Sequence, residues 1–207
     1  MVSQNILQLW VLPLYEDLKP ITIEENLLSK KLSKNRAKEF TYSRGYMREI
    51  LSKHLNIHPL KLPLEAEPGK VPRLRNNLGY ISLSHCKDAL FLGWSNIKFG
   101  IDIERKDRIF KPITIIDKYY LEEEKKELLA LEEEELRAKT LKYWVIKEAA
   151  IKCQNGTIST DLSKWLITNN FMRAYHKSLK IDFRTSYIEY DNWALGIAYN
   201  SINLEIK

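Results

Sequence analysis

The segment Asp88-Ala-Leu-Phe-Leu-Gly-Trp-Ser-Asn96 has a counterpart about 105 residues later, Trp193-Ala-Leu-Gly-Ile-Ala-Tyr-Asn200. Each reads as the second strand of a hairpin, because a short strand-like stretch precedes it. Regions with helical spacing, residues 24–56 and 113–153, come before the two hairpins. The recurrence predicts an α+β fold of two similar halves packed as an intramolecular pseudo-dimer, with antiparallel strands and one long helix per half.

The other predicted strands complete the two halves. Residues 6–12, 80–84 and 89–95 are strand-like in the first half, and residues 57–77, which hold four prolines, read as a loop. In the second half we expect strands at 99–104, 164–168, 172–176, 179–188 and 193–199, and a weak point of the helical region near residues 132–135. We place the halves at residues 1–98 and 99–207, with the active site at their interface, where clefts form.

The composition narrows the class of protein. The chain has 207 residues, of which 44% are hydrophobic and 29% charged, which excludes a disordered or collagen-like protein. Its apolar runs are shorter than the roughly 18 residues that span a bilayer, so no membrane association is expected. Two cysteines, Cys86 and Cys153, make no disulfide framework, which fits the reducing cytoplasm.

The net charge of +6 is unevenly distributed. Residues 122–135 hold eight glutamates and two lysines, a local charge of −6 that is typical of a solvated helix face. Residues 30–75 hold twelve Lys and Arg against four Asp and Glu, a local charge of +8. This basic region predicts an anionic partner.

The sharpest chemical signal is Gly100-Ile101-Asp102-Ile103-Glu104. On a strand, Asp102 and Glu104 share one face and the isoleucines the other. Neighbouring carboxylates repel each other unless a cation lies between them, and oxygen ligands favour Mg²⁺ or Mn²⁺. The alternative is an exposed strand face with ordinary acidic residues.

A second signal is Trp144-Val-Ile-Lys147-Glu148-Ala-Ala-Ile-Lys152. In a helix, Trp144, Glu148 and Lys152 lie four residues apart on one face. They form either a core tryptophan beside an ordinary Glu–Lys pair, or a third metal carboxylate followed one turn later by a phosphate-binding cation. Three carboxylates and a lysine together suit a Mg²⁺-bound diphosphate.

Two turns add weaker signals. Ile81-Ser-Leu-Ser84-His85-Cys86 ends a strand, and its histidine reads either as a phosphate donor or as a structural turn residue. Gly69-Lys70-Val-Pro72-Arg73 offers flexibility, a cation and a flat prolyl ring to a nucleotide.

Taken together, these motifs resemble the 4′-phosphopantetheinyl transferase superfamily. Gly-Ile-Asp-Ile-Glu is followed about 40 residues later by Trp-x-x-Lys-Glu-Ala-x-x-Lys, and the Gly69-Lys70 and Ser84-His85 turns precede both in the family's order. The resemblance covers roughly residues 69–165 well and 30–55 more loosely. In length and internal repeat the chain is similar to the pseudo-dimeric, monomeric Sfp type rather than to the short trimeric type.

The resemblance implies roles for individual residues. Asp102, Glu104 and Glu148 would hold Mg²⁺ against the diphosphate of coenzyme A, and Lys152 would contact that diphosphate and stabilise the departing oxygen. The implied nucleotide contacts are His85 at the 3′-phosphate, the Gly69-Lys70 turn at the adenine, and Arg36, Lys38 and Arg44 as further phosphate cations. Glu124 falls on the family's acidic position and is a candidate base, with Glu122, Glu123 and Glu148 as alternatives. The family commonly has Gly-Lys-Pro where this chain has Gly-Lys-Val-Pro, which puts the contact of Pro72 in doubt.

The implied activity is transfer of the 4′-phosphopantetheine arm from coenzyme A to a serine of an acidic apo carrier protein, acyl or peptidyl, of a fatty-acid, polyketide or peptide synthetase. Adenosine 3′,5′-bisphosphate would be released, and a cytoplasmic monomer with no nucleic-acid partner is expected. One alternative is a Mg²⁺-dependent nuclease, although the usual Glu-x-Lys of such sites lies on a strand. The other is a non-catalytic module that binds carrier proteins.

Overall fold

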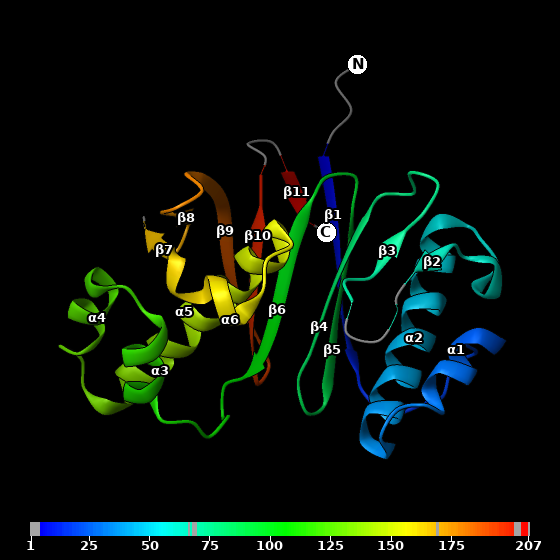
Figure 1. The fold of residues 1–207 in the computed structure, drawn as a ribbon, viewed down its shortest axis with the longest axis horizontal. Helices are drawn as coiled ribbons and strands as arrows, with labels where there is room; N and C mark the ends of the chain where they lie inside the picture. Colours follow the sequence, from blue (N-terminus) through cyan, green and yellow to red (C-terminus); the bar gives the residue numbers. More distant parts are fainter. Residues whose placement is uncertain (1–4, 66, 68–69, 169, 201–203, 207) are drawn as a thin grey trace.

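The computed structural model describes residues 5–65, 67, 70–168, 170–200 and 204–206. In this part of the chain, six α-helices and antiparallel sheets form a mixed α+β fold, as expected from the sequence (Figure 1). None of the helices described is long and apolar enough to cross a membrane. The predicted turn at Gly69-Lys70 lies partly outside the described residues, because Gly69 is not among them.

The first sheet has the strand order β11-β1-β5-β4, with β1 at Asn5–Pro13, β4 at Tyr80–His85, β5 at Ala89–Ser95 and β11 at Leu204–Ile206. Strands β1, β5 and β4 pair antiparallel, whereas β11 pairs parallel to β1. The strand β11 was not predicted, and it carries the end of the chain across to a sheet built otherwise from the first hundred residues.

The second sheet has the order β6-β10-β9-β8-β7 and is antiparallel throughout. Its strands are β6 at Phe99–Arg105, β7 at Trp165–Thr168, β8 at Arg173–His176, β9 at Ile181–Tyr190 and β10 at Trp193–Tyr199. A two-stranded ladder, β2 at Leu64–Glu65 and β3 at Arg73–Leu74, lies within the segment that we predicted to be a loop. The two segments of the internal repeat, β5 and β10, are both flanked by antiparallel neighbours.

The helical regions are divided more finely than predicted. The first consists of α1 at Ile23–Ser29 and α2 at Lys34–Leu55, and the second of α3 at Pro112–Tyr119, α4 at Glu122–Leu128 and α5 at Glu133–Gln154, followed by the short α6 at Ile158–Asp161. The predicted weak point near residue 132 is confirmed, because α5 begins after Glu132. Helices α2 and α5 both have 22 residues, and each ends at an asparagine in the left-handed conformation, Asn56 and Asn155.

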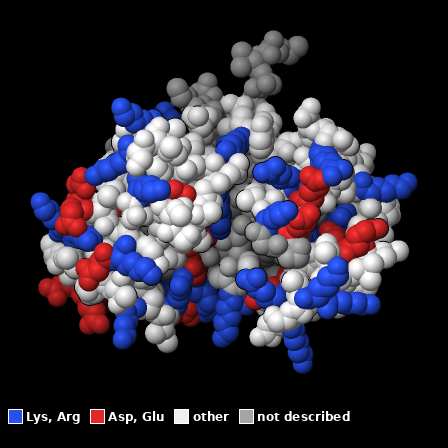
Figure 2. All heavy atoms as spheres, in the orientation of Figure 1, with Lys and Arg blue, Asp and Glu red and all other residues white. Residues whose placement is uncertain are grey.

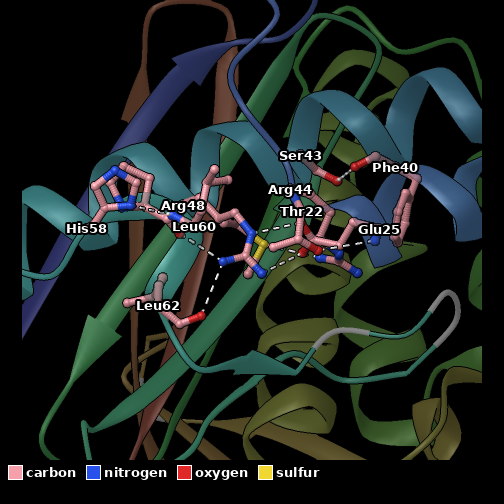
Figure 3. A network of polar contacts seen from close by, with 11 residues as sticks. Thr22, Glu25, Phe40, Ser43, Arg44, Arg48, His58, Leu60 and Leu62 are labelled. Atoms are coloured by element: carbon pink, nitrogen blue, oxygen red, sulfur yellow. Dashed lines mark hydrogen bonds and ion pairs between the residues drawn. The ribbon is translucent and has the colours of Figure 1, made fainter.

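Helix α1 is anchored to α2 by a buried ion pair (Figure 3). Arg48 contacts both carboxylate oxygens of Glu25, at 2.7 and 3.0 Å, and also donates to the backbone oxygens of Pro59 and Leu62. Glu25 additionally caps α1 by accepting from the backbone N–H of Thr22. Because each polar group of the pair has several partners, the ionic contact fixes the outer helix layer of the first sheet.

Helix α5 packs directly on β6 and β10 of the second sheet. Two glycines allow this approach: a Cβ at Gly100 would overlap the backbone oxygen of Ala149, and one at Gly196 would overlap that of Val145. The helix thereby seals a core that is completed by Trp165.

The two sheets approach each other at β4 and β6, which run side by side in Figure 1. Ser82 of β4 accepts a hydrogen bond of 3.2 Å from the backbone N–H of Ile101 in β6. The strand with the Ser84-His85 turn therefore lies against the strand with Asp102 and Glu104.

We expect Gly100→Ala to lower the free energy of unfolding by about 2–3 kcal/mol, because the added methyl group would push α5 off β6. Urea denaturation measures the change. Gly156→Ala is the control, since its Cβ would meet mainly the side chain of Asp161 rather than the backbone of a helix and should cost less. Equal stability of the two variants would contradict this account.

Candidate active site

The acidic strand β6 has the alternation that its sequence predicts. Ile101 and Ile103 are buried in a hydrophobic cluster, while Asp102 and Glu104 share the other face. Asp102 is only 2% exposed, so this is no solvated strand face. Glu104 is partly buried and forms an ion pair with Arg108, which follows in the turn after β6.

Helix α5 brings the second motif to these carboxylates. Glu148 and Lys152 lie one turn apart on α5, which confirms their helical spacing. Glu148 is 8% exposed and lies near enough to Asp102 and Glu104 to feel both charges. Trp144 packs edge-on against Tyr119 and beside Arg108 and is partly buried in the core, as in the simpler of our two interpretations.

Burial and neighbouring negative charge raise the pKa values of Glu104 and Glu148. Burial, followed by the charge of Asp102, raises the pKa of Glu148 to about 8. The same two causes raise the pKa of Glu104 to about 7, against the opposing effects of Arg108 and Lys152. A cation bound beside Glu104 and Glu148 would therefore favour the loss of their protons near neutral pH.

Lys152 supplies one cation directly. Its Nζ lies 2.7 Å from Oδ1 of Asp102 and 2.8 Å from Oγ of Ser84, and Ser84 donates to the same Oδ1 at 2.6 Å. The other oxygen of Asp102, Oδ2, is buried and has no hydrogen-bond partner.

The donor set fits a divalent cation in its chemistry. The three carboxylates are hard ligands of the kind that Mg²⁺ and Mn²⁺ prefer, and one of their oxygens, Oδ2 of Asp102, is buried without a hydrogen-bond partner. As they are arranged, no group of three or more acidic, histidine or cysteine side chains among the described residues is close enough to hold a metal by itself. Mg²⁺ commonly binds through one or two carboxylates together with substrate phosphates and water, and such a site needs no complete protein cage.

A cleft of about 1300 Å³ opens beside Lys152. One wall comes from α2 and another from the end of α5. A third comes from the segment around β3 and β4, namely residues 70–74, residues 77–83 and His85. The cations that line it are Arg36, Arg44, Lys70, Arg73, Lys98 and Lys152. Figure 2 shows basic side chains on both halves of the molecule, interspersed with acidic ones.

The predicted nucleotide-binding residues fall into two groups. Arg36, Arg44, Lys70 and His85 all line the cleft, as does Pro72, whose contact the Gly-Lys-Val-Pro spacing had put in doubt. Lys38 is not among the lining residues, and its Nζ instead lies over the rings of Tyr15 and Tyr42 at 4.2 and 5.9 Å.

Arg44 is the most unusual of the lining cations (Figure 3). It is almost fully buried against Phe40, its Nε has no hydrogen-bond partner, and it contacts the sulfur of Met47. Burial lowers the pKa of its guanidinium to about 10. Its neighbour Arg48 takes the carboxylate of Glu25, so Arg44 remains the buried cation that an anion in the cleft would stabilise most.

Glu124 occupies a different environment, in the core below α5. It is 1% exposed, forms an ion pair of 2.6 Å with Lys147 and accepts hydrogen bonds from the backbone N–H groups of Leu121 and Ile167. Burial lowers the pKa of Lys147, which the charge of Glu124 opposes. These contacts speak for a structural role that joins α4 to α5. Its neighbours Glu122 and Glu123 form ion pairs with Lys125 and Lys177.

Sequence reasoning missed three members of the site. Arg73 and Lys98 line the cleft, and Ser84 bridges Lys152 and Asp102. Arg73 and Ser84 belong to segments that the sequence had singled out as turns, so their positions carried a signal, but the structure places them in strands β3 and β4. Lys98 follows a turn and gives no such signal.

We expect Glu124→Gln to lower the free energy of unfolding by about 3 kcal/mol, because it would leave Lys147 charged and unpaired in the core. The double variant Glu124→Gln/Lys147→Met should recover part of this loss in urea denaturation. A Glu124→Gln protein of normal stability would argue against the structural role.

We also expect a pH dependence of stability from Glu148. Its folded pKa, about 8, lies above that of an unfolded glutamate, so its contribution is present below about pH 4.5 and is lost as the pH rises towards 8. Between pH 5 and 8 the wild-type protein should lose about 1–3 kcal/mol more than Glu148→Gln, which mimics the protonated carboxyl group. Denaturation of both proteins across this range measures the difference, and parallel curves would contradict it.

Comparison with known proteins agrees with this geometry. No curated protein matches the chain. A family model, however, matches just under half of it, in the region that holds β6, α5 and the three carboxylates. Residues 98–198 thus match the 4′-phosphopantetheinyl transferase superfamily, in agreement with the resemblance of their motifs.

Proposed function

We propose that the chain transfers the 4′-phosphopantetheine arm from coenzyme A to a serine of an apo carrier protein, with Mg²⁺ or Mn²⁺ as cofactor and adenosine 3′,5′-bisphosphate as the released product. The observation that carries the proposal is the junction at Lys152, which contacts the carboxylate cluster and also lines the basic cleft. A diphosphate at this junction would lie between a divalent cation and the lysine. The family match supports the reaction class.

The acidic side of the junction would hold the metal. Asp102, Glu104 and Glu148 are the proposed ligands, and the bound ion would neutralise charge on the diphosphate. The carrier serine hydroxyl would attack the phosphorus that bears the pantetheine arm, and the oxygen bridging to the adenosine phosphate would leave. Lys152 is the proposed partner of that departing oxygen.

Glu148 is the base that we favour for the serine proton. It lies beside Asp102 and Glu104 and one turn before Lys152 on α5, so at the proposed diphosphate site it could take the serine proton directly or through a water. Glu124 was our first candidate, but its oxygens already serve Lys147 and two backbone N–H groups in the core.

The basic side would hold the nucleotide. Arg36, Arg44, Lys70 and His85 are the proposed contacts of its phosphates and base, and Arg44 has the most to gain from an anion because it is buried and its Nε has no hydrogen-bond partner. We leave Lys38 out of this set because it packs on Tyr15 and Tyr42.

We further propose that the chain is a cytoplasmic, monomeric Sfp-type enzyme, with its site between two pseudo-symmetric halves. The equal lengths of α2 and α5, their shared asparagine caps and the similar places of β5 and β10 support this arrangement. With halves at 1–98 and 99–207, the strand β11 of the second half would join the sheet of the first half, where it pairs with β1. The basic surface suits an acidic acyl or peptidyl carrier of a fatty-acid, polyketide or peptide synthetase.

The test is incubation with coenzyme A, Mg²⁺ and a panel of apo carriers, read by intact mass. We expect a gain equal to the phosphopantetheine group, and a loss of at least 10²-fold in rate for Asp102→Ala and Glu148→Ala. Glu123→Ala is the control, because this exposed carboxylate pairs with Lys177 away from the cluster.

Three outcomes would speak against the proposal. Normal labelling by Asp102→Ala would remove the metal role of the cluster. Binding of coenzyme A without any turnover would indicate a carrier-binding module. Salt-sensitive DNA cleavage would indicate a nuclease, although Glu148 and Lys152 lie on a helix rather than on a strand.

A further inference from the structure

A closed triangle of polar atoms from three elements lies beside the cleft, and Lys152 is its member that lines the cleft. Lys152 of α5, Asp102 of β6 and Ser84 of β4 contact one another at 2.6–2.8 Å. Ser84 is the corner that belongs to the other sheet, and its hydroxyl donates to the carboxylate and accepts from the ammonium group. The motifs that identify Asp102 and Lys152 assign no task to this serine.

The electrostatics of the triangle explain why it closes. Asp102 is almost fully buried beside Glu104 and Glu148, and a buried charge of this kind is costly without a counter-ion. Lys152 provides that charge through Oδ1 and leaves Oδ2 without a partner. The lysine side chain itself is 28% exposed and lines the cleft, so it has room to leave Asp102 for an anion in the cleft.

We propose that Ser84 is a positioning residue that holds Lys152 on Asp102 as an exchangeable internal counter-ion, which a divalent cation replaces. Once Lys152 is released from Asp102, its ammonium group is free to contact the diphosphate. Binding of the metal to Asp102 and binding of Lys152 to the diphosphate are therefore coupled. The inference rests on the proposed function, since the diphosphate is the destination of the lysine.

The exchange also has a consequence for metal affinity. The metal and Lys152 compete for Asp102, and the Ser84 hydroxyl stabilises the contact of Lys152 with Asp102. Removing this hydroxyl should therefore tighten metal binding. A serine that ligated or merely supported the metal would have the opposite effect or none. The sign of the change therefore separates this role from the simpler ones.

Strand β4 offers a matched control. Ser82 lies two residues before Ser84 on the same face of β4, and the two are 6% and 7% exposed. Its hydroxyl also bonds to β6, but to the backbone N–H of Ile101 rather than to Asp102. Ser82→Ala removes a similar buried hydroxyl without touching the triangle.

The experiment is a titration of the full chain with Mn²⁺ alone, with free Mn²⁺ followed by electron paramagnetic resonance. We expect Ser84→Ala to bind Mn²⁺ about 10- to 100-fold more tightly than the wild type, as loss of one hydrogen bond to a charged group implies. Ser84→Thr should restore the wild-type affinity, and Ser82→Ala should leave it unchanged. In a Lys152→Met background, Ser84→Ala should have no effect, because the lysine it positions is gone.

Weaker or unchanged Mn²⁺ binding by Ser84→Ala would overturn the inference, as would an equal effect of Ser84→Ala with and without Lys152. A wild-type chain that binds no Mn²⁺ would overturn it as well. The titration uses neither coenzyme A nor a carrier, so it is independent of transfer. If Ser84→Ala tightens Mn²⁺ binding only in the presence of Lys152 but the chain shows no transferase activity, the proposed function is contradicted and the role of Ser84 still holds.

Discussion

Three carboxylates lie close together in a largely buried position, and the rest of the site is arranged around their mutual repulsion. Asp102, Glu104 and Glu148 come from a strand and a helix whose other faces are buried, so they cannot turn away to water. Burial and the charge of Asp102 raise the pKa of Glu104 to about 7 and that of Glu148 to about 8. Lys152 and Arg108 oppose this effect, and a divalent cation would oppose it further.

The closeness follows from backbone packing. Gly100 and Gly196 let α5 lie against β6 and β10 at a distance that any side chain would prevent, and this brings Glu148 to Asp102. The contact of β4 with β6 then adds Ser84 from the first sheet. The acidic cluster is thus a product of the second sheet and its helix, whereas its link to the cleft requires both sheets.

The sequence predicted those parts of the fold that local patterns control. Alternation on residues 99–104, four-residue spacing on α5 and the break near residue 132 are local, and they are found as predicted. The strand β11, the ladder of β2 with β3 and the breaks between helices depend on partners far along the chain, and no local pattern announced them. The same division applies to the candidate site. Residue spacing was enough to single out Asp102 and Lys152. The buried ion pair of Glu124 with Lys147, however, depends on tertiary packing, so the sequence motif alone could not show whether Glu124 lies in the core or in an active site.

The carboxylate cluster and most cations of the cleft come from different parts of the chain. Residues 98–198, which match the family model, contain all three carboxylates and Lys152, the groups that we propose for a metal and a diphosphate. Most other cations of the cleft, including Arg36, Arg44 and Lys70, lie before residue 98. In the proposed reaction the reacting atoms fix the geometry of the first set closely. A phosphate farther along a nucleotide would accept cations from many positions, so the proposed reaction constrains the second set less.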